Sequence, residues 1–343
     1  MSCNLNNNML IILVFSFMVI LVSNSFILID AETINNKPIR IGFPLWVPDL
    51  LAFVAQDKGF FKKNNVDVNL TLIPKYNDAI NAYTNRDYDG IFAVYSDFII
   101  QQSEGIDTKV VYGVDYSNTA DAIVGKGNSL LDFKGKNISI VGINTFSHYF
   151  VLKALEKVGL TEGDVQFVNM PFQNVTTALQ KGQIFAGHTY APFISDAIKK
   201  GFKVLFTGAE VAIPLTDVMA FHSDIVQQRP QDIQNIVKSM VEAKADYDKN
   251  KEQDISIMAA KSGLSREQIN EGINNVNLLG LGSNVQNSMN KTSNNLTSMY
   301  VSGNNIAKFY SEIGVISEYP NIDDLVDPQF VNTLFKENNM TKP

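Results

Sequence analysis

From residue 39 onward, short apolar runs alternate with segments whose apolar residues recur three and four positions apart. The runs predict strands at residues 39–43, 66–73, 88–94, 109–114, 138–141, 165–168, 184–187 and 204–206. The helically spaced segments between them predict helices at residues 49–61, 79–85, 97–104, 150–158, 175–180 and 192–200. Repeated strand–helix–strand order is typical of parallel sheets, so the pattern predicts two α/β units spaced by roughly 100 residues.

The pattern becomes purely helical after Arg229. Helices are predicted at residues 230–249, 254–262, 265–274 and 304–313. Ser265 followed by Gln268 fits a capping box, in which each side chain bonds the backbone N–H of the other residue. Residues 278–302 are rich in Asn and Ser and predict a long loop with a helical turn.

The N-terminal segment is almost entirely apolar. Residues 9–22 contain one Ser and no charge, and small residues follow as far as Ser25, which is typical of a secretory signal. The residues before the apolar run lack Lys and Arg, and residues 9–29 are long enough to cross a bilayer, so an uncleaved anchor stays open. We therefore predict a signal peptide or anchor at 1–25, a linker at 26–37, and an exported body that is periplasmic or on the cell surface.

Composition narrows the class of protein. The chain has 343 residues, 45% hydrophobic and 18% charged, which is typical of a globular protein of two domains. It has 35 acidic and 28 basic residues, a net charge of −7, and no cluster of Lys and Arg, so nucleic acid is not an expected partner. Its one cysteine is Cys3, which excludes disulfides, thiolate metal sites and a cysteine nucleophile from the body.

The motifs of several enzyme classes are absent from the sequence. It contains no phosphate-binding loop, no dinucleotide-binding glycine pattern after a strand, and no zinc-protease or serine-hydrolase signature. The three histidines, His148, His188 and His222, lie too far apart for any pair to have metal-ligand spacing. We therefore expect no metal and no cofactor, and the sequence favours binding over catalysis.

Three stretches carry a resemblance to a known family. The first runs from Gly42 to Val68 and contains Lys58-Gly-Phe-Phe-Lys; the second runs from Phe133 to Met170; the third runs from Ala178 to Val218 and contains Tyr190-Ala-Pro192. Together they resemble the solute-binding proteins of ABC importers for taurine, aliphatic sulfonates, nitrate and thiamine pyrimidines. The taurine-binding type is the most similar, and the resemblance extends from about Ile39 to about Phe330.

The resemblance implies an α/β type-II periplasmic-binding-protein fold. Two lobes, each with a mainly parallel sheet flanked by helices, would enclose a ligand cleft and close over it by hinge bending. Lobe 1 would comprise residues 38–122 and 223–330, lobe 2 residues 123–222, and a C-terminal tail residues 331–343. The chain would cross between the lobes near residues 121–123 and 219–222.

The implied function is that of an exported, non-enzymatic receptor. A monomer would deliver a small organic anion or zwitterion, similar to taurine or an alkanesulfonate, to the permease of an ABC importer. The membrane would be contacted only through the N-terminal segment, if that segment is not cleaved. A nitrate or thiamine-pyrimidine receptor and an enzyme of the same fold remain alternatives, although the enzymes of this fold use a cysteine and this chain has only Cys3.

Candidate ligand contacts in lobe 1 follow its predicted strands. Trp46 follows the first strand, at the carboxyl edge where α/β sheets bind ligands, and it offers a cation–π face or is a core ring. Tyr95 and Ser96 stand where the family usually has Gly-Ser-Ser. Tyr95 would alter the shape of the pocket, and Ser96 would hold an oxyanion or cap a helix.

Candidate contacts in lobe 2 surround the start of its first helix. Ser147 and His148 would add donors there to a helix dipole that attracts sulfonate or nitrate, and Thr145 or Ser147 would cap the helix. Tyr190 would stack on the ligand, donate its hydroxyl, or lie in the core. Asp217, at the return to lobe 1, would pair with a ligand amine or cap the hinge.

Overall fold

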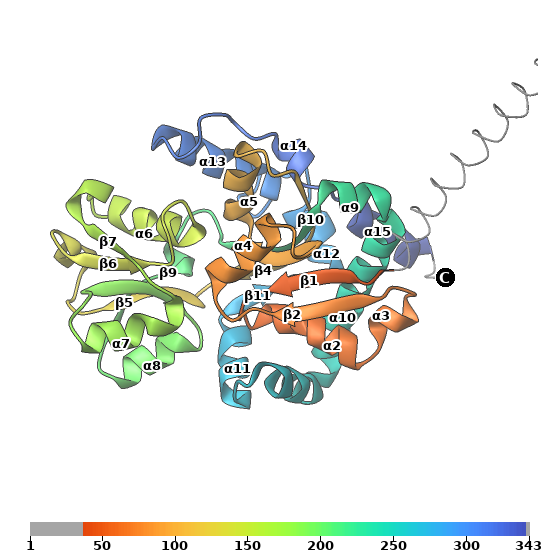
Figure 1. Cartoon of the computed structure of the whole chain (residues 1–343), viewed down its shortest axis with the longest axis horizontal. Coiled ribbons are helices and arrows are strands. Elements are labelled where there is room, and N and C mark those ends of the chain that lie inside the picture. Colours follow the sequence, from red (N-terminus) through yellow and green to blue (C-terminus); the bar gives the residue numbers. More distant parts are fainter. Residues whose placement is uncertain (1–36, 341–343) are drawn as a thin grey trace, which may run out of the picture. The chain divides into compact units, whose positions relative to one another are not determined.

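The computed structural model describes residues 37–340, and of these residues 39–340 belong to one compact unit with two β-sheets. The predicted signal peptide or anchor lies outside the described residues. Sheet A has the strand order β11-β4-β10-β3-β1-β2, and sheet B has the order β7-β6-β8-β5-β9 (Figure 1). Within residues 37–340, no helix is both long and apolar enough to cross a membrane.

Sheet A is built from strands of both ends of the chain. Its strands are β1 (Ile39–Phe43), β2 (Val68–Leu72), β3 (Gly90–Val94), β4 (Thr108–Ser117), β10 (Thr216–His222) and β11 (Val276–Leu278). The β1 strand pairs in parallel with β2 and β3, whereas β10 lies antiparallel between β3 and β4, and β11 is antiparallel to β4. All seven residues of β10 are buried because it is a central strand covered on both faces.

Sheet B is smaller and is also mixed. Its strands are β5 (Asp121–Gly125), β6 (Asn137–Ile140), β7 (Gln166–Asn169), β8 (Ala186–Tyr190) and β9 (Lys203–Thr207). The β6 strand is parallel to β7 and β8, whereas β5 is antiparallel to β8 and β9. Sheet A therefore has two parallel and three antiparallel strand pairings, and sheet B has two of each, so the sheets are partly rather than mainly parallel. The strands next to each passage between the sheets are the ones that run against their neighbours.

Helices cover both sheets. With sheet A the structure places η1 (Pro48–Leu50), α2 (Leu51–Asp57), α3 (Phe60–Lys63), α4 (Tyr76–Thr84), α5 (Tyr95–Ser103), α9 (Ser223–Gln228), α10 (Pro230–Ser262), α11 (Arg266–Asn274), α12 (Leu281–Ser283), η6 (Asn284–Ser288), α13 (Met299–Glu312), α14 (Ile322–Leu325) and α15 (Gln329–Met340). With sheet B it places η2 (Leu130–Phe133), α6 (Phe146–Glu156), η3 (Glu162–Asp164), η4 (Phe172–Asn174), α7 (Val175–Gln180), α8 (Phe193–Lys199) and η5 (Gly208–Glu210).

Several local predictions can be compared with these bounds. The capping box at Ser265 and Gln268 is confirmed. The two helices predicted at 230–249 and 254–262 are joined in α10, which kinks at Asn250, where φ is −122° and ψ is 34°. The segment predicted as a C-terminal tail contains most of α15, which is amphipathic and buries Phe330, Val331 and Leu334.

The passages between the sheets lie outside the strands. The chain leaves sheet A after Ser117, enters sheet B at Asp121, and returns between Thr207 and Thr216. Residues 216–222, which the sequence assigned to lobe 2 and its second crossing, therefore form a strand of sheet A. The physical reason is the double pairing of β10 with β3 and β4, which the sequence pattern of one strand does not reveal.

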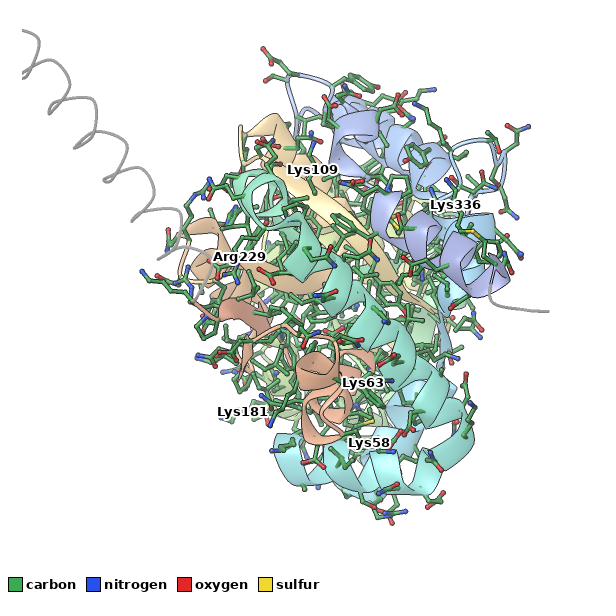
Figure 2. The ribbon with its side chains drawn as sticks, turned by 90° about the vertical axis from the view of Figure 1, so that its right-hand side faces the viewer. Lys58, Lys63, Lys109, Lys181, Arg229 and Lys336 are labelled. Carbon is green, nitrogen blue, oxygen red and sulfur yellow. The ribbon has the colours of Figure 1, made fainter. Side chains whose placement is uncertain are left out.

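Basic side chains on the outer helices pair with acids on the same face. Lys58 contacts both Asp246 and the buried Asp254, at 2.6 Å from the latter, and Lys63 lies 3.0 Å from Glu242. Figure 2 shows both lysines beside α10, on a face that also displays Arg229. These positive charges are thus neutralised along α10.

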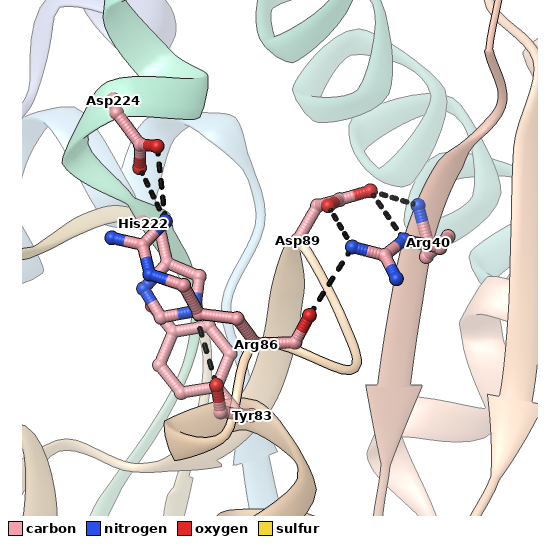
Figure 3. Close-up of polar contacts among 6 residues, drawn as sticks. All are labelled: Arg40, Tyr83, Arg86, Asp89, His222 and Asp224. Carbon is pink, nitrogen blue, oxygen red and sulfur yellow. Dashed lines mark hydrogen bonds and ion pairs between the residues drawn. The ribbon is translucent and has the colours of Figure 1, made fainter.

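A second set of charges lies at the amino ends of β1 and β3. Arg40 binds Asp89 through its backbone N–H and guanidinium, with Nη2–Oδ1 at 2.6 Å, and Arg86 binds Asp224 at 2.9 Å (Figure 3). The buried His222 stacks on Tyr83 at 4.1 Å between ring centroids, and its Nε2 donates to the Tyr83 carbonyl at 3.1 Å. Burial lowers the pKa of His222, so its imidazole is neutral at pH 7.

Candidate functional site

A narrow cavity lies at the opposite end of sheet A, where β1 and β3 end and β10 begins. The segments of sheet A and sheet B both contribute to its wall. The wall is lined by Pro44, Leu45, Trp46, Tyr76, Val94, Ser117, Asp121, Phe146, Tyr190, Leu215 and Asp217. This position is the carboxyl edge of the parallel strands, where open α/β sheets bind ligands.

Aromatic rings make up much of the wall and join the two sheets. Trp46, in the loop after β1, meets Tyr190 at the end of β8 with ring centroids 5.5 Å apart and planes nearly perpendicular. Tyr76, at the start of α4, meets Phe146, at the start of α6, at 4.8 Å. Because each pair joins one sheet to the other, the rings hold the structure closed around the cavity.

The cavity has a volume of about 390 Å³, including the part that is open to solvent. Sites that bind small molecules are commonly clefts of this size. A solute in it would contact segments of both sheets, because both contribute to the wall.

Carboxyl groups cluster at the cavity because of the strand register. Asp217 of β10 lies directly opposite Asp115 of β4, so both side chains point to the same face of sheet A. Asp115 Oδ2 accepts the Trp46 indole N–H at 2.9 Å. Asp49 in η1 lies fully buried beside them, and neither of its carboxyl oxygens has a hydrogen-bond partner. Among the described residues, no Lys, Arg or His forms an ion pair with Asp49, Asp115 or Asp217.

This crowding changes the acidity of the cluster. Burial and the neighbouring carboxylates raise the pKa values of Asp49 and Asp115 well above their ordinary range. Burial also raises the pKa of Asp217 to about 7. Burial and mutual repulsion therefore oppose full ionisation of the cluster at neutral pH.

The Asp97 carboxylate links the half of the molecule around sheet A to the half around sheet B. Asp97 of α5 accepts a 2.5 Å hydrogen bond from the Phe146 backbone N–H and a 2.8 Å bond from the Tyr76 hydroxyl. Phe146 is the first residue of α6, so Asp97 occupies the positive end of that helix. Burial raises the pKa of Asp97 to about 7 despite these two bonds.

Asp121 begins a buried polar chain in sheet B. Its Oδ1 lies 3.0 Å from His188 Nε2, and His188 Nδ1 lies 2.9 Å from Ser147 Oγ. The Ser147 hydroxyl in turn accepts the Val141 backbone N–H at 3.1 Å. Each group along this chain of hydrogen bonds has a protein partner. Of its three side chains, Asp121 lines the cavity, and His188 and Ser147 lie behind it.

Three of the seven residues selected from the sequence line the cavity. Trp46 and Tyr190 contact each other in its wall, and Asp217 contributes its carboxyl group. The other four residues lie elsewhere. Their surroundings explain why.

Tyr95 and Ser96 face away from the cavity. The Tyr95 hydroxyl donates to the Met299 carbonyl at 3.0 Å, at the start of α13, and Ser96 lies buried near the Tyr310 hydroxyl of the same helix. Val94, one residue earlier, supplies the cavity wall instead. The sequence gives no indication that α13 packs on this side of α5.

Ser147 and His148 are buried in sheet B's half of the molecule. Ser147 belongs to the polar chain described above, and Thr145 is the residue that caps α6, accepting from the His148 backbone N–H. The His148 imidazole packs at 5.0 Å from the Phe167 ring, and its Nε2 lies 3.5 Å from Glu162. Burial lowers the pKa of His148.

Sequence reasoning missed the groups that define the charge of the cavity. Asp49 and Asp115 each lie in an apolar stretch, a position that hints at a buried role but not at a shared one. Asp97 stands in the first turn of α5 and looks there like an ordinary helix-start residue. Tyr76 and Phe146 are likewise helix-start residues whose meeting depends on the approach of the two sheets. In the part of the chain that the structure describes, no group of three His, Cys, Asp or Glu residues is arranged to hold a metal ion.

Comparisons with known proteins match this architecture. A profile described as "NMT1/THI5 like" matches residues 50–253. The taurine-binding periplasmic protein of Escherichia coli (strain K12) is 30% identical over 142 residues, which cover 39% of this chain and 44% of that relative. The match therefore spans less than half of the relative's length.

Solved structures extend the likeness over most of the chain. The alkanesulfonate-binding protein SsuA from Xanthomonas axonopodis pv. citri, bound to MOPS, has a TM-score of 0.71 and 17% identity, covering 85% of this chain and 98% of its own. The desulfurization enzyme DSZB has a TM-score of 0.63 and 13% identity, covering 88% and 100%. These likenesses confirm the periplasmic-binding-protein fold. Since the family profile covers more than half of the chain, the chain belongs to the NMT1/THI5-like family.

Proposed function

We propose that this protein is a non-enzymatic solute receptor that binds a small charged molecule between its two sheets and presents it to an ABC importer. The observation that carries the proposal is the cavity at the carboxyl edge of sheet A, enclosed by rings from both sheets and bordered by Asp121 and Asp217. A site that closes over its occupant in this way is typical of hinged binding proteins. The names of its relatives support transport of a solute such as taurine or an alkanesulfonate.

The export and permease parts of this proposal rest on the relatives alone. The E. coli relative is named as a periplasmic protein, and the predicted N-terminal signal agrees with that location. Delivery to a permease is likewise inferred from relatives that are import components. The division into two lobes and a monomeric state remain predictions of the sequence.

An enzyme is the second candidate, favoured by the fold of the desulfurization enzyme. Its support is weaker here. The described cavity wall contains no Cys, and Asp217 has no basic residue among the described residues placed to exchange a proton with it. Incubation of the protein with each bound compound, followed by mass spectrometry of the compound, separates the two functions: a receptor returns it unchanged.

A thermal-shift screen with the full chain tests the receptor proposal. The panel contains taurine, alkanesulfonates, nitrate, pyrimidines, amines and quaternary ammonium compounds. A ligand at 100 times its Kd stabilises the folded state by about 2.7 kcal/mol, which gives a clear rise in melting temperature. Failure of every class to bind would overturn the proposal.

A further inference from the structure

The charge of the cavity wall differs from what a sulfonate or nitrate site requires. The two carboxyl side chains that line it are Asp121 and Asp217, and the described lining contains no Lys, Arg or His, although Asp121 is bonded to His188 behind the wall. Behind Asp217 lie Asp49 and Asp115, both fully buried. An anion entering this cavity would meet carboxyl groups whose ionised forms repel it in a medium that screens charge weakly.

The buried acids also lack partners of their own. Both oxygens of Asp49, Oδ1 of Asp115 and Oδ2 of Asp217 are buried without a hydrogen-bond donor outside the carboxyl cluster itself. Asp217 is only 6% exposed, and its side chain borders the cavity. Buried carboxylates are ordinarily paired, so this arrangement leaves a position for a positive charge that the chain does not fill.

The helix that would attract an anion is already occupied. The α6 N-terminus is the element from which the sequence predicted an anion site, but the Asp97 carboxylate binds its first N–H at 2.5 Å. The protein thus supplies its own anion at that point. A ligand sulfonate would have to displace Asp97 and leave the Tyr76 hydroxyl without its 2.8 Å acceptor.

Four basic residues of sheet A's half are paired elsewhere. Lys58 and Lys63 are bound by acids of α10 on the outer face (Figure 2), and Arg40 and Arg86 are bound at the amino ends of the strands (Figure 3). Recruiting any of them to the cavity would break one of these ion pairs. Neutralisation of the cavity by one of these four residues would therefore break an existing ion pair, whereas a cationic ligand would leave all of them intact.

From these contacts we propose that the solute bound in this cavity is a small organic cation, an alkyl or quaternary ammonium, held by Asp217 and Asp121 between the rings of Trp46, Tyr76, Phe146 and Tyr190. The inference rests on the proposed receptor function and specifies the charge of its ligand. Aromatic faces attract organic cations through their quadrupoles, and such rings do not ligate metal ions. The aromatic rings and the carboxyl groups therefore both favour a small organic cation.

The test compares ligands that differ mainly in charge. Isothermal titration calorimetry with the full chain uses choline, tetramethylammonium and ethylammonium as cations, 3,3-dimethyl-1-butanol as the neutral isostere of choline, ethanesulfonate as an anion, and taurine as a zwitterion. At least one of the three cations is expected to bind. If that cation is choline, it is expected to bind at least tenfold more tightly than its neutral isostere. Ethanesulfonate is expected not to bind.

Two variants test the Asp217 carboxylate and the Trp46 ring, and two further variants serve as matched controls. Asp217→Asn keeps the shape of the side chain and removes its charge, and it is expected to weaken binding of the cation at least tenfold. Trp46→Leu removes a ring face and is expected to weaken it similarly, whereas Trp46→Phe keeps a ring and is expected to stay within about threefold. Asp224→Asn makes the same change of charge in the paired cluster of Figure 3 and is expected to leave the affinity unchanged.

The outcomes separate the inference from the proposed function. Three results would overturn the cation assignment but leave the receptor function intact. They are binding of ethanesulfonate, binding of taurine to Asp217→Asn with undiminished affinity, and binding of the neutral isostere as tightly as choline. Binding of nitrate or a pyrimidine, with none of the cations bound, would do the same. If no compound of any class binds the folded chain, the receptor function itself fails.

Discussion

Both ends of sheet A carry charged side chains, but only one end neutralises them. At the amino ends of β1 and β3, Asp89 is held by Arg40, and Asp224 is held by Arg86 (Figure 3). At the carboxyl ends, Asp115 and Asp217 oppose each other across neighbouring strands without a basic partner among the described residues. The sheet is the same, so the difference lies in pairing: the chain neutralises the charges at one end and leaves the carboxyl groups at the other end without a basic partner among the described residues.

Asp97 gives the most sensitive test of this difference between the two ends. It lies near the carboxyl ends of the strands, but its carboxylate accepts hydrogen bonds from the protein. Asp97→Ala is expected to lower the free energy of unfolding by about 2–4 kcal/mol, since it leaves the Phe146 N–H and the Tyr76 hydroxyl buried without an acceptor. Urea denaturation measures the loss. Asp97→Asn keeps an acceptor for Phe146 and is expected to lose less than half as much.

If both Asp97 variants lose little, pairing does not explain the stability of this region. The distinction between the ends of the sheet would then depend on position alone. The same measurement on the Asp97→Ala variant would also reveal any weakening of the contact between α5 and α6.

Replacement of Asp217 is expected to raise the free energy of unfolding, in contrast to replacement of Asp97. Its pKa of about 7 in the folded protein, against an ordinary value of 3.8, means that folding becomes less favourable as pH rises from about 4 to about 7 and then levels off. The carboxyl groups that face it are Asp49, Asp115, Asp121 and, near Tyr76, Asp97. Asp217→Asn is therefore expected to stabilise the ligand-free protein by about 1–3 kcal/mol at pH 8.

The check is a denaturation series from pH 4 to pH 8 on the wild type and on Asp217→Asn. The stabilisation is expected to shrink as the pH falls toward 4, because the folded-state carboxyl is then protonated and the unfolded-state carboxyl approaches half protonation. A variant that is less stable than the wild type at pH 8 would mean that the Asp217 carboxylate has a stabilising partner and belongs with the paired charges.

A smaller loss is expected at the paired end. Asp89→Ala removes the acceptor of the Arg40 backbone N–H at 2.8 Å and of its guanidinium at 2.6 Å, and it is expected to destabilise the fold by about 1 kcal/mol. The guanidinium part of the loss weakens at high salt because Arg40 is half exposed. A salt-independent loss would assign the whole effect to the backbone bond.

The smallest effect is expected at Asp224. Its ion pair with Arg86 is exposed on both sides, and such pairs contribute about 0–1 kcal/mol. Asp224→Asn is therefore expected to change the free energy of unfolding by less than about 0.5 kcal/mol, measured in the same urea series. A change of 2 kcal/mol would show that the exposed pair of the cluster is coupled to the buried His222 and Tyr83.

The sequence predicted most elements because their signals are local. The spacing of apolar residues located β1, α10 and α11, and the Ser265 capping box defined where α11 begins. It also placed Trp46 at the carboxyl edge of the sheet, because that position follows directly from the end of the first strand. These are properties that a few neighbouring residues decide.

What the sequence could not predict depends on register and on distant packing. Asp217 meets Asp115 only because β10 runs antiparallel to β4 in one particular register, and a shift by one residue would separate them. Asp97 and Phe146 are 49 residues apart, and their bond requires two sheets to approach each other. For the same reason the sequence suggested a sulfonate site at the start of α6, where Asp97 already lies.

Trp46 gives the cavity a spectroscopic reporter of its own. It is the one tryptophan among 343 residues, its ring stands in the cavity wall, and its indole N–H is bonded to Asp115. Tryptophan fluorescence of the unlabelled protein therefore comes from this point alone. Separation of the sheets would bring water to the indole and shift its emission to longer wavelengths, and closure over a solute would shift it back, so opening and filling can be followed in real time by stopped flow without attaching a dye.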